Sequence, residues 1–469
     1  MAPTLYMIAP SPPVRSVLIT AKALGIQLQE KAVDFQKGEH LQPEYLKINP
    51  QHTVPTLVDD DGFIVWDSHA INPYLVSKYG KNDSLYPKDL KKRAIVDQRL
   101  HFDSGVAFAR GITIIGQILR EGKTSLTDKD KESLTQVYEF LEAFLDGKQW
   151  MAGDSVTIAD YNLYATISGS NVLVPVDSQK FPKVAAWLKK VDALPEAEVS
   201  KKGLEVFTTM MKSKLHRFKA RTTDQLVTGT GYYESMTHSH HKFCDRCSVN
   251  SVTMAPTLYM LPASPAVRSV QITAKAIGLQ MEEKLVDLSK GEHLKPEYLK
   301  LNPQHTVPTL VDDDGLTIWD SHAINAYLVS KYAKNDSLYP KDLAKRAIID
   351  QRLHFDSGVA FPAGARITAA ILRAGKKSID DSDKESVNAV YAFLEAFLEK
   401  KSWMAGESVT IADYNLYATV TTLNVLVPLD GQKYQKLSAW VKKVDGLSEA
   451  EANKKGIAGY EAMIKSLLA

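Results

Sequence analysis

The sequence of 469 residues contains little cysteine: its two cysteines, Cys244 and Cys247, lie close together near the middle. The long stretches on either side therefore have no disulfides and no cysteine-based nucleophilic or redox chemistry. Basic and acidic side chains nearly balance, at 57 against 55, so the strong positive bias of a nucleic-acid binder is also missing. No run approaches the roughly 18 apolar residues that span a bilayer, and residues 1–4 do not open like a signal peptide. We expect a cytoplasmic protein that binds neither nucleic acid nor membrane.

What the sequence does contain is an internal repeat. Residues 1–7, 49–58 and 67–72 return at 254–260, 302–311 and 320–325, each displaced by 253 positions without insertion or deletion. About 70% of the aligned positions are identical. A period this long is too large for a solenoid unit and indicates two complete domain sets in tandem. The second Met-Ala-Pro at 254 suggests that two reading frames have been fused.

The segment that joins the copies, residues 216–253, has a different composition. It is rich in Ser, Thr, Gly and His and lacks helical or strand periodicity, so we expect a flexible linker with a reach of about 35 Å. Its His238–Cys247 stretch has residue types that bind zinc. A second paired set at finger spacing is missing, however, and few apolar residues surround it. We predict no metal site, and an ordinary linker is the simpler interpretation.

Each copy divides into a mixed part and a helical part. Over residues 1–80 the order is βαβ followed by ββα, with a hairpin signal at Asp59–Gly62. Residues 88–215 carry helical signals only, among them 93–108, 130–145, 157–168 and 184–194, and Thr157–Asp160 has the form of a capping box. The predicted domains are 1–82 and 88–215 in copy 1, and 254–335 and 341–469 in copy 2.

Polar residues stand at the junctions of these elements. Ser11 joins the first strand to the first helix, where it either caps the helix or faces an anion at the positive end of the helix dipole. One loop can serve both purposes. The Val54–Pro55 bond precedes a strand and is either an ordinary trans turn or a cis bond that leaves backbone groups free for an extended peptide. Asp67 and Ser68 open a helix, either as a plain cap or as holders of a ligand's ammonium and carboxylate groups.

Taken together, the motifs Ser-Pro-Pro-x-Arg, Asn-Pro-Gln-His-Thr-Val-Pro, Asp-Ser-His-Ala-Ile and Thr-Ile-Ala-Asp-Tyr resemble those of cytosolic glutathione transferases, most closely the insect epsilon class and then the delta class. The resemblance covers both copies and is absent only from the linker. It implies a thioredoxin-like α/β domain followed by an all-α domain in each copy. It also implies that glutathione is a co-substrate, that no cofactor is needed, and that the copies form a homodimer or an intramolecular pseudo-dimer.

The resemblance assigns residues to parts of glutathione. Ser11 would bond the sulfur, Val54 beside cis-Pro55 would pair with the cysteinyl backbone, and Asp67 and Ser68 would hold the γ-glutamyl end. His40 and His52 lie in loops, where a histidine is usually solvated, but the resemblance places them near the glycyl or thiol side. The matching residues of copy 2 are Ser264, His293, His305, Val307, Pro308, Asp320 and Ser321. Many family members have Glu where this chain has Asp67 and Asp320.

The implied reaction needs a thiolate. A free thiol of pKa near 8.5 is only a few per cent ionised at pH 7. One hydrogen bond to a charged group contributes roughly 1.5–3 kcal/mol, which corresponds to about one to two pKa units. The thiolate would attack small hydrophobic electrophiles in an apolar pocket, for which Phe108, Arg110, Ile115 and Phe207 are candidates, although core packing explains these residues as well. A non-catalytic carrier with the same fold is the alternative.

Overall fold

The computed structural model describes residues 2–215 and 255–469. The predicted linker at 216–253, with its His238–Cys247 stretch, lies outside the described residues. Each described copy begins with a four-stranded mixed sheet and continues as a bundle of helices, as the sequence predicts. None of the described helices is both long and apolar enough to cross a membrane.

The first domain of copy 1 alternates strands and helices. Its elements are β1 (Thr4–Met7), α1 (Pro12–Leu24), β2 (Gln29–Ala32), α2 (Pro43–Ile48), β3 (Thr56–Val58), β4 (Ile64–Trp66) and α3 (Ser68–Tyr79). The strand order is β2-β1-β3-β4, with β1 parallel to β2 and antiparallel to β3. Helix α1 buries Val14, Val17 and Ala21 on one face and ends at Gly25, whose φ of 72° is the left-handed conformation that glycine adopts readily.

The corresponding elements of copy 2 have nearly the same lengths. They are β5 (Thr257–Met260), α10 (Pro265–Ile277), β6 (Glu282–Leu285), α11 (Pro296–Leu301), β7 (Thr309–Val311), β8 (Thr317–Trp319) and α12 (Ser321–Tyr332). The order β6-β5-β7-β8 repeats the topology of the first sheet. The 253-residue repeat in the sequence is therefore also a repeat in structure.

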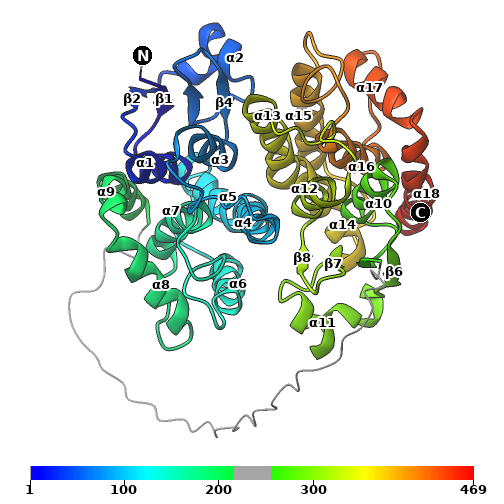
Figure 1. Cartoon of the computed structure of the whole chain (residues 1–469), viewed down its shortest axis with the longest axis horizontal. Coiled ribbons are helices and arrows are strands. Elements are labelled where there is room, and N and C mark those ends of the chain that lie inside the picture. The colour runs from blue at the N-terminus through cyan, green and yellow to red at the C-terminus, as the bar shows by residue number, and fades with distance from the viewer. Residues whose placement is uncertain (1, 216–254) are drawn as a thin grey trace, which may run out of the picture.

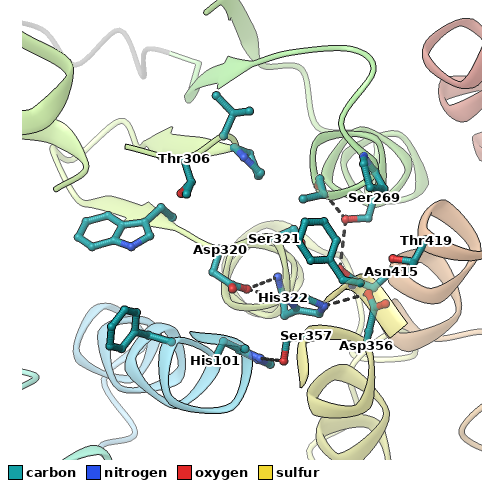
Figure 2. A pocket seen from close by; sticks show the side chains of 18 of the residues that line it. His101, Ser269, Thr306, Asp320, Ser321, His322, Asp356, Ser357, Asn415 and Thr419 are labelled. Carbon is teal, nitrogen blue, oxygen red and sulfur yellow. Dashed lines mark hydrogen bonds and ion pairs between the residues drawn. The ribbon is translucent and has the colours of Figure 1, made fainter. Parts of the chain in front are cut away.

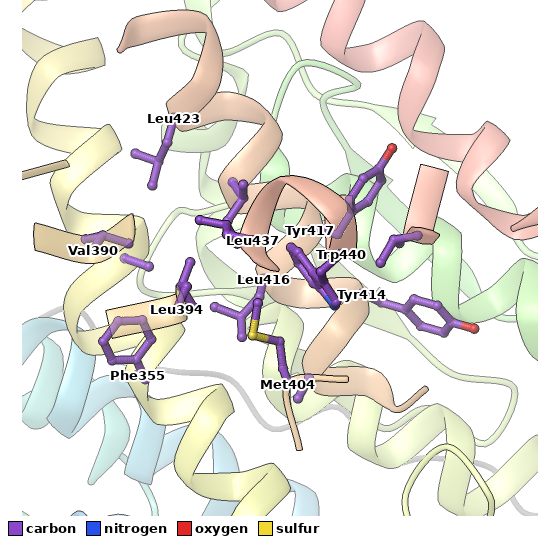
Figure 3. Close-up of a cluster of buried hydrophobic side chains, with 14 of the residues drawn as sticks. Phe355, Val390, Leu394, Met404, Tyr414, Leu416, Tyr417, Leu423, Leu437 and Trp440 are labelled. Atoms are coloured by element: carbon purple, nitrogen blue, oxygen red, sulfur yellow. The ribbon is translucent and has the colours of Figure 1, made fainter. Parts of the chain in front are cut away.

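The second domain of each copy is entirely helical. In copy 1 the helices are α4 (Leu90–Phe102), α5 (Phe108–Arg120), α6 (Asp128–Phe144), α7 (Ile158–Leu173), α8 (Pro182–Asp192) and α9 (Glu198–Lys214). In copy 2 they are α13 (Leu343–Phe355), α14 (Phe361–Ala374), α15 (Asp381–Phe397), α16 (Ile411–Leu426), α17 (Gln435–Asp445) and α18 (Glu451–Leu468). Figure 3 shows part of the core of copy 2, where side chains from several of these helices, including Leu416 and Trp440, pack together.

The predicted capping box at Thr157 is present at the start of α7. Asp160 accepts hydrogen bonds from the Thr157 N–H at 2.9 Å and from the indole N–H of Trp187 at 3.0 Å. It also accepts from the Met151 N–H at 2.9 Å. An aspartate therefore serves at this cap because its carboxylate also ties α8 and the preceding loop to α7.

The structure differs from the sequence prediction at one helix. The sequence predicts a continuous helix over 93–108, but α4 ends at Phe102 and a five-residue π-helical turn, Asp103–Ala107, precedes α5. The same turn occurs at Asp356–Ala360 in copy 2. Periodicity did not reveal this turn because it depends on contacts with residues that lie far away in the sequence.

The two copies pack against each other in opposite orientations. In Figure 1 the sheet of copy 1 lies at the top and that of copy 2 at the bottom, with α3, α4, α12 and α13 between them. The contacts are reciprocal: the Gln98 side chain donates to the Trp319 carbonyl at 3.1 Å, and Gln351 donates to the Trp66 carbonyl at 3.0 Å. An approximate twofold axis therefore relates the copies within one chain.

The π-helical turns meet at this axis. The hydroxyls of Ser104 and Ser357 lie 3.0 Å apart, and each also bonds a histidine of the other copy. A Cβ at Gly105 would come within 2.9 Å of the Ser357 carbonyl oxygen. Glycine is thus required for this close approach of the two backbones.

Candidate functional site

Ser11 lies at the N-terminus of α1, and its hydroxyl is not used as a cap. Its backbone has the extended conformation of an N-cap residue, but the side chain accepts no capping hydrogen bond. In copy 2 the Ser264 hydroxyl accepts only a long contact of 3.5 Å from the Val267 N–H. A half-buried hydroxyl at the positive end of a helix is therefore available to an anion.

A second group of binding atoms lies at the turn before β3. The Val54–Pro55 and Val307–Pro308 bonds are both cis. Among the described residues, none hydrogen-bonds the backbone N–H or C=O of Val54 or Val307. These groups are open to an extended peptide that pairs with them as a short strand.

Asp67 and Ser68 stand at the start of α3. Asp67 has a φ of 73° and uses one carboxylate oxygen, Oδ1, to accept from the backbone and imidazole of His69, at 2.9 and 2.8 Å. Its other oxygen has no partner among the described residues, and neither does the Ser68 hydroxyl. The pair thus offers a carboxylate oxygen for an ammonium group, and a hydroxyl with a helix N-terminus for a carboxylate.

His69 connects the start of α3 to the π-helical turn. Its second imidazole nitrogen lies 3.0 Å from the buried carboxylate of Asp103 in the π-helical turn. Burial opposes a charge on His69, but the carboxylates of Asp67 and Asp103 raise its pKa to about 10. In copy 2, burial raises the pKa of Asp320, but His322 and His101 outweigh burial and lower it to about 2. Asp320 is therefore ionised at neutral pH.

The predicted histidines lie in pairs, one pair in each copy. The rings of His40 and His52 are 6.1 Å apart, and those of His293 and His305 are 6.0 Å apart. Burial lowers the pKa of His40, and the neighbouring His52 lowers it further. The His52 ring lies 5.6 Å from Phe393 of the other copy. Each histidine pair therefore offers imidazole nitrogens next to an aromatic ring of the other copy, since His305 likewise lies 5.7 Å from Phe140.

A cavity of about 170 Å³ joins several of these groups in copy 2. Figure 2 shows Thr306, Asp320, Ser321 and His322 around it, together with His101 from α4 of copy 1. Val307, Pro308 and Phe361 line it as well, whereas Ser264, His293 and His305 do not. The cavity is therefore built by both copies.

Nearly all the residues around this cavity are the same at the matching positions of copy 1. The exception is Ala266, where copy 1 has Pro13. Because the polar groups are the same in both copies, whatever binds in copy 2 finds the same partners in copy 1.

The sequence did not identify the residues that contact the other copy. His101 lies 3.1 Å from the Ser357 hydroxyl and stacks on His354 at 4.0 Å, and it also stacks on His322 at 4.7 Å. Burial lowers the pKa of His101 and of His354 well below the usual value, so both are neutral. A signal was present: the stretch 97–108 returns without change at 350–361, although α5 and α14 diverge directly after it.

The four candidates for the apolar pocket have different surroundings. Phe108 begins α5, and its counterpart Phe361 lines the cavity of copy 2. Ile115 and Phe207 belong to one apolar cluster between α5 and α9. Arg110 donates to the Ser133 carbonyl on α6 at 3.0 Å. Ile115 and Phe207 thus pack together, and the arginine is tied to the neighbouring helix.

The whole arrangement suits an extended peptide with two charged ends. One end meets a carboxylate, a hydroxyl and a helix N-terminus, the middle meets free backbone groups, and the other end meets imidazole N–H donors.

Comparison with known protein families agrees with this geometry. The glutathione S-transferase N-terminal domain model matches residues 1–77 and 254–330. The glutathione S-transferase C-terminal domain model matches residues 95–195 and 348–446.

Individual relatives each match about one copy. Glutathione S-transferase 1 of Manduca sexta is 48% identical over 196 residues, 41% of this chain and 89% of the relative. Glutathione S-transferase D7 of Anopheles gambiae is 42% identical over 219 residues, 46% of this chain and 99% of the relative. An epsilon-class glutathione S-transferase from the housefly Musca domestica has a solved structure with 48% identity and a TM-score of 0.44, covering 45% of this chain and 98% of that one.

Proposed function

The chain belongs to the glutathione S-transferase family, in two tandem copies related to insect epsilon and delta enzymes, and from this premise we propose that each copy ionises the thiol of glutathione with a serine hydroxyl. The observation that carries the proposal is the hydroxyl of Ser11 at the N-terminus of α1, which no capping bond occupies. A thiolate that accepts this hydrogen bond gains roughly 1.5–3 kcal/mol. The helix dipole adds roughly 0.3–1 kcal/mol.

Glutathione is held at three places. Its γ-glutamyl ammonium pairs with the open oxygen of Asp67, and the α-carboxylate meets the hydroxyl and N–H of Ser68. The cysteinyl unit pairs with the backbone of Val54. His40 and His52 donate to the glycyl carboxylate. Asp320, Ser321, Val307, His293 and His305 do the same in copy 2.

The thiolate then attacks a small hydrophobic electrophile in the apolar pocket beside Phe108. Ser11 keeps its proton throughout, because it acts as a hydrogen-bond donor and not as a nucleophile. Glutathione is consumed as a co-substrate, and the proposed reaction requires no cofactor.

We also propose that the copies of one chain pair with each other. This pairing is supported by the reciprocal hydrogen bonds that Gln98 and Gln351 make to the other copy. It is also supported by the contact of His52 with a ring of copy 2 and by His101, which lines the cavity of copy 2. Residues 216–253 connect the copies, so the second copy is always present at the high effective concentration of an intramolecular partner. The ion pairs between the copies do not themselves favour pairing of copy 1 with copy 2 over pairing of two like copies. Lys91 pairs with Asp314 at 2.8 Å, but Ala344 stands at the position of copy 2 that matches Lys91.

Intramolecular pairing predicts a single-chain particle. Size-exclusion chromatography with light scattering is expected to give the chain mass of 52.0 kDa at every protein concentration. A mass of twice that value, or a rise toward it with concentration, would show that copies pair between chains instead.

The competing function is a carrier that binds glutathione without turnover. Titration calorimetry is expected to count two glutathione sites per chain, and chlorodinitrobenzene is expected to be consumed only when glutathione is present. Binding at two sites with no conjugate formed would support the carrier. No binding at all would contradict both functions.

A further inference from the structure

One arginine has different surroundings in the two copies. Arg120 is the last residue of α5, and Arg373 occupies the matching position of α14. In copy 1 the guanidinium folds back over Gly116, one turn earlier: a Cβ there would lie 3.1 Å from Nη2 and 3.7 Å from Cζ of Arg120. Copy 2 has Ala369 at the position of Gly116. Its methyl group crowds the place that the guanidinium takes in copy 1, and this turns the end of Arg373 away from its own helix.

The charge of Arg373 acts on the histidine pair of copy 2. Burial lowers the pKa of His293, and the guanidinium of Arg373 lowers it further. Burial also lowers the pKa of His305, and His293 and Arg373 both add to this effect. Because exposed charges are screened over short distances in water, the guanidinium lies close to both rings. In copy 1, burial and the neighbouring histidine lower the pKa of His40 without a contribution from Arg120.

The guanidinium of Arg373 is also free to bind a ligand. The residue is exposed, and no described residue forms a hydrogen bond or an ion pair with it. Glu121, which follows Arg120 directly in copy 1, is replaced by Ala374 in copy 2, so the adjacent carboxylate is missing there. A guanidinium has donors and no acceptor, and its planar fork fits a carboxylate. The end of the copy 2 site that holds the two histidines thus gains a permanent positive charge.

The same end of copy 1 has an apolar neighbour instead. The Phe35 ring stacks on His40 with the ring centres 4.0 Å apart. Copy 2 has Leu288 at the position of Phe35. The two copies therefore keep the same histidines but surround them differently, with a ring in copy 1 and with a cation in copy 2.

We propose that Arg373 binds the glycyl carboxylate of glutathione in copy 2, beside His293 and His305, and that Arg120 leaves this carboxylate of copy 1 to the histidines alone. This inference rests on the proposed glutathione transferase reaction, in which the histidine pair receives the glycyl end. Copy 2 therefore selects peptides with a free terminal carboxylate, whereas copy 1 discriminates less against an ester. The carboxylate does not change during the reaction, so Arg373 contributes to KM and not to kcat.

The test uses full chains in which one site is unaltered. At about pH 6.5 the Ser11→Ala chain reports mainly on copy 2, and the Ser264→Ala chain reports mainly on copy 1. For each chain, kcat and KM are measured with chlorodinitrobenzene for glutathione and for its glycyl ethyl ester. The ratio of the ester KM to the glutathione KM is expected to be about threefold to fivefold higher for copy 2, which is the size of an exposed ion pair.

Arg373→Ala in the Ser11→Ala chain is expected to raise the KM for glutathione about threefold to fivefold. The kcat and the KM for the ester are expected to stay unchanged, and added salt is expected to reduce the effect. Arg120→Ala in the Ser264→Ala chain is the matched control. It removes the same side chain from the same helix position and is expected to change neither KM.

The reciprocal change is Gly116→Ala in the Ser264→Ala chain. The new methyl group crowds the flexible end of Arg120, and alanine also favours the helix, so this variant is expected to fold. It is expected to turn the arginine toward His40 and to lower the KM for glutathione about threefold, with no change for the ester. Addition of Arg120→Ala is expected to cancel this gain.

Equal KM ratios in the two single-site chains would overturn the inference. An Arg373→Ala chain whose KM rises equally for glutathione and for the ester, or whose kcat alone falls, would overturn it as well. A wild-type chain that neither binds nor conjugates glutathione would instead overturn the proposed function, and the inference with it.

Discussion

Removal of both serine hydroxyls, in the variant Ser11→Ala/Ser264→Ala, is expected to slow conjugation of chlorodinitrobenzene about tenfold to fiftyfold at pH 6.5. The hydroxyl lowers the thiol pKa by about one to two units, so its loss returns the thiol toward 8.5 and the thiolate fraction falls. Because the thiol is mostly ionised at high pH with or without the hydroxyl, the difference in rate is expected to fall below about twofold at about pH 9. Rates across this pH range are the measurement.

The matched control is Ser213→Ala/Ser466→Ala. These serines also occupy equivalent positions in the two copies, and each donates at 2.8 Å to a carbonyl of its own helix, far from the site loops in sequence. This control is expected to keep the wild-type pH profile. If the Ser11→Ala/Ser264→Ala variant keeps it as well, the serines do not ionise the thiol.

The second large effect is expected from one methyl group on α18. Gly456→Ala would place its Cβ on the Pro262 carbonyl oxygen and 2.6 Å from the Arg268 side chain. A backbone atom cannot move aside as the end of a flexible side chain can. Helix α18 must therefore move away from the loop that ends at Ser264. We expect the free energy of unfolding of copy 2 to fall by about 3 kcal/mol, and the activity of a Ser11→Ala chain to fall with it. Urea denaturation and the conjugation rate measure the two effects.

The same helix supplies the control. Gly459 has no neighbour within 4 Å of its missing Cβ, so Gly459→Ala is expected to be tolerated and to stabilise α18 by up to about 1 kcal/mol. Gly203→Ala repeats the test in copy 1, where the methyl group would meet the Ala9 carbonyl oxygen before Ser11. Equal stability of the Gly456→Ala and Gly459→Ala chains would show that close packing of α18 on the loop is not needed.

The fold of each copy follows largely from short-range signals. Apolar spacing over α1, the turn at Asp59–Gly62 and the cap at Thr157 each act within a few residues, so the sequence alone could place them. The π-helical turn at Asp103 could not be placed in this way. It depends on the bond of Asp103 to His69 and on the contact of Gly105 with the other copy.

The candidate site likewise contains residues that local sequence patterns identify and residues that they do not. Ser11, Val54 and Asp67 stand at element boundaries, where local patterns and the family resemblance both point. His101 and Ser104 lie within a helix and a π-helical turn, and their partners lie about 250 residues away in the chain. Only the pairing of the copies gives them a role, and no local pattern encodes that pairing.

The most direct measurement is the ultraviolet absorbance of the bound thiolate as a function of pH. We expect the wild-type chain saturated with glutathione to show two thiolates per chain, titrating about one to two pKa units below the free thiol, and the Ser11→Ala/Ser264→Ala chain to show this titration near the free value of 8.5. Bound glutathione that titrates like free glutathione in the wild-type chain would contradict the account.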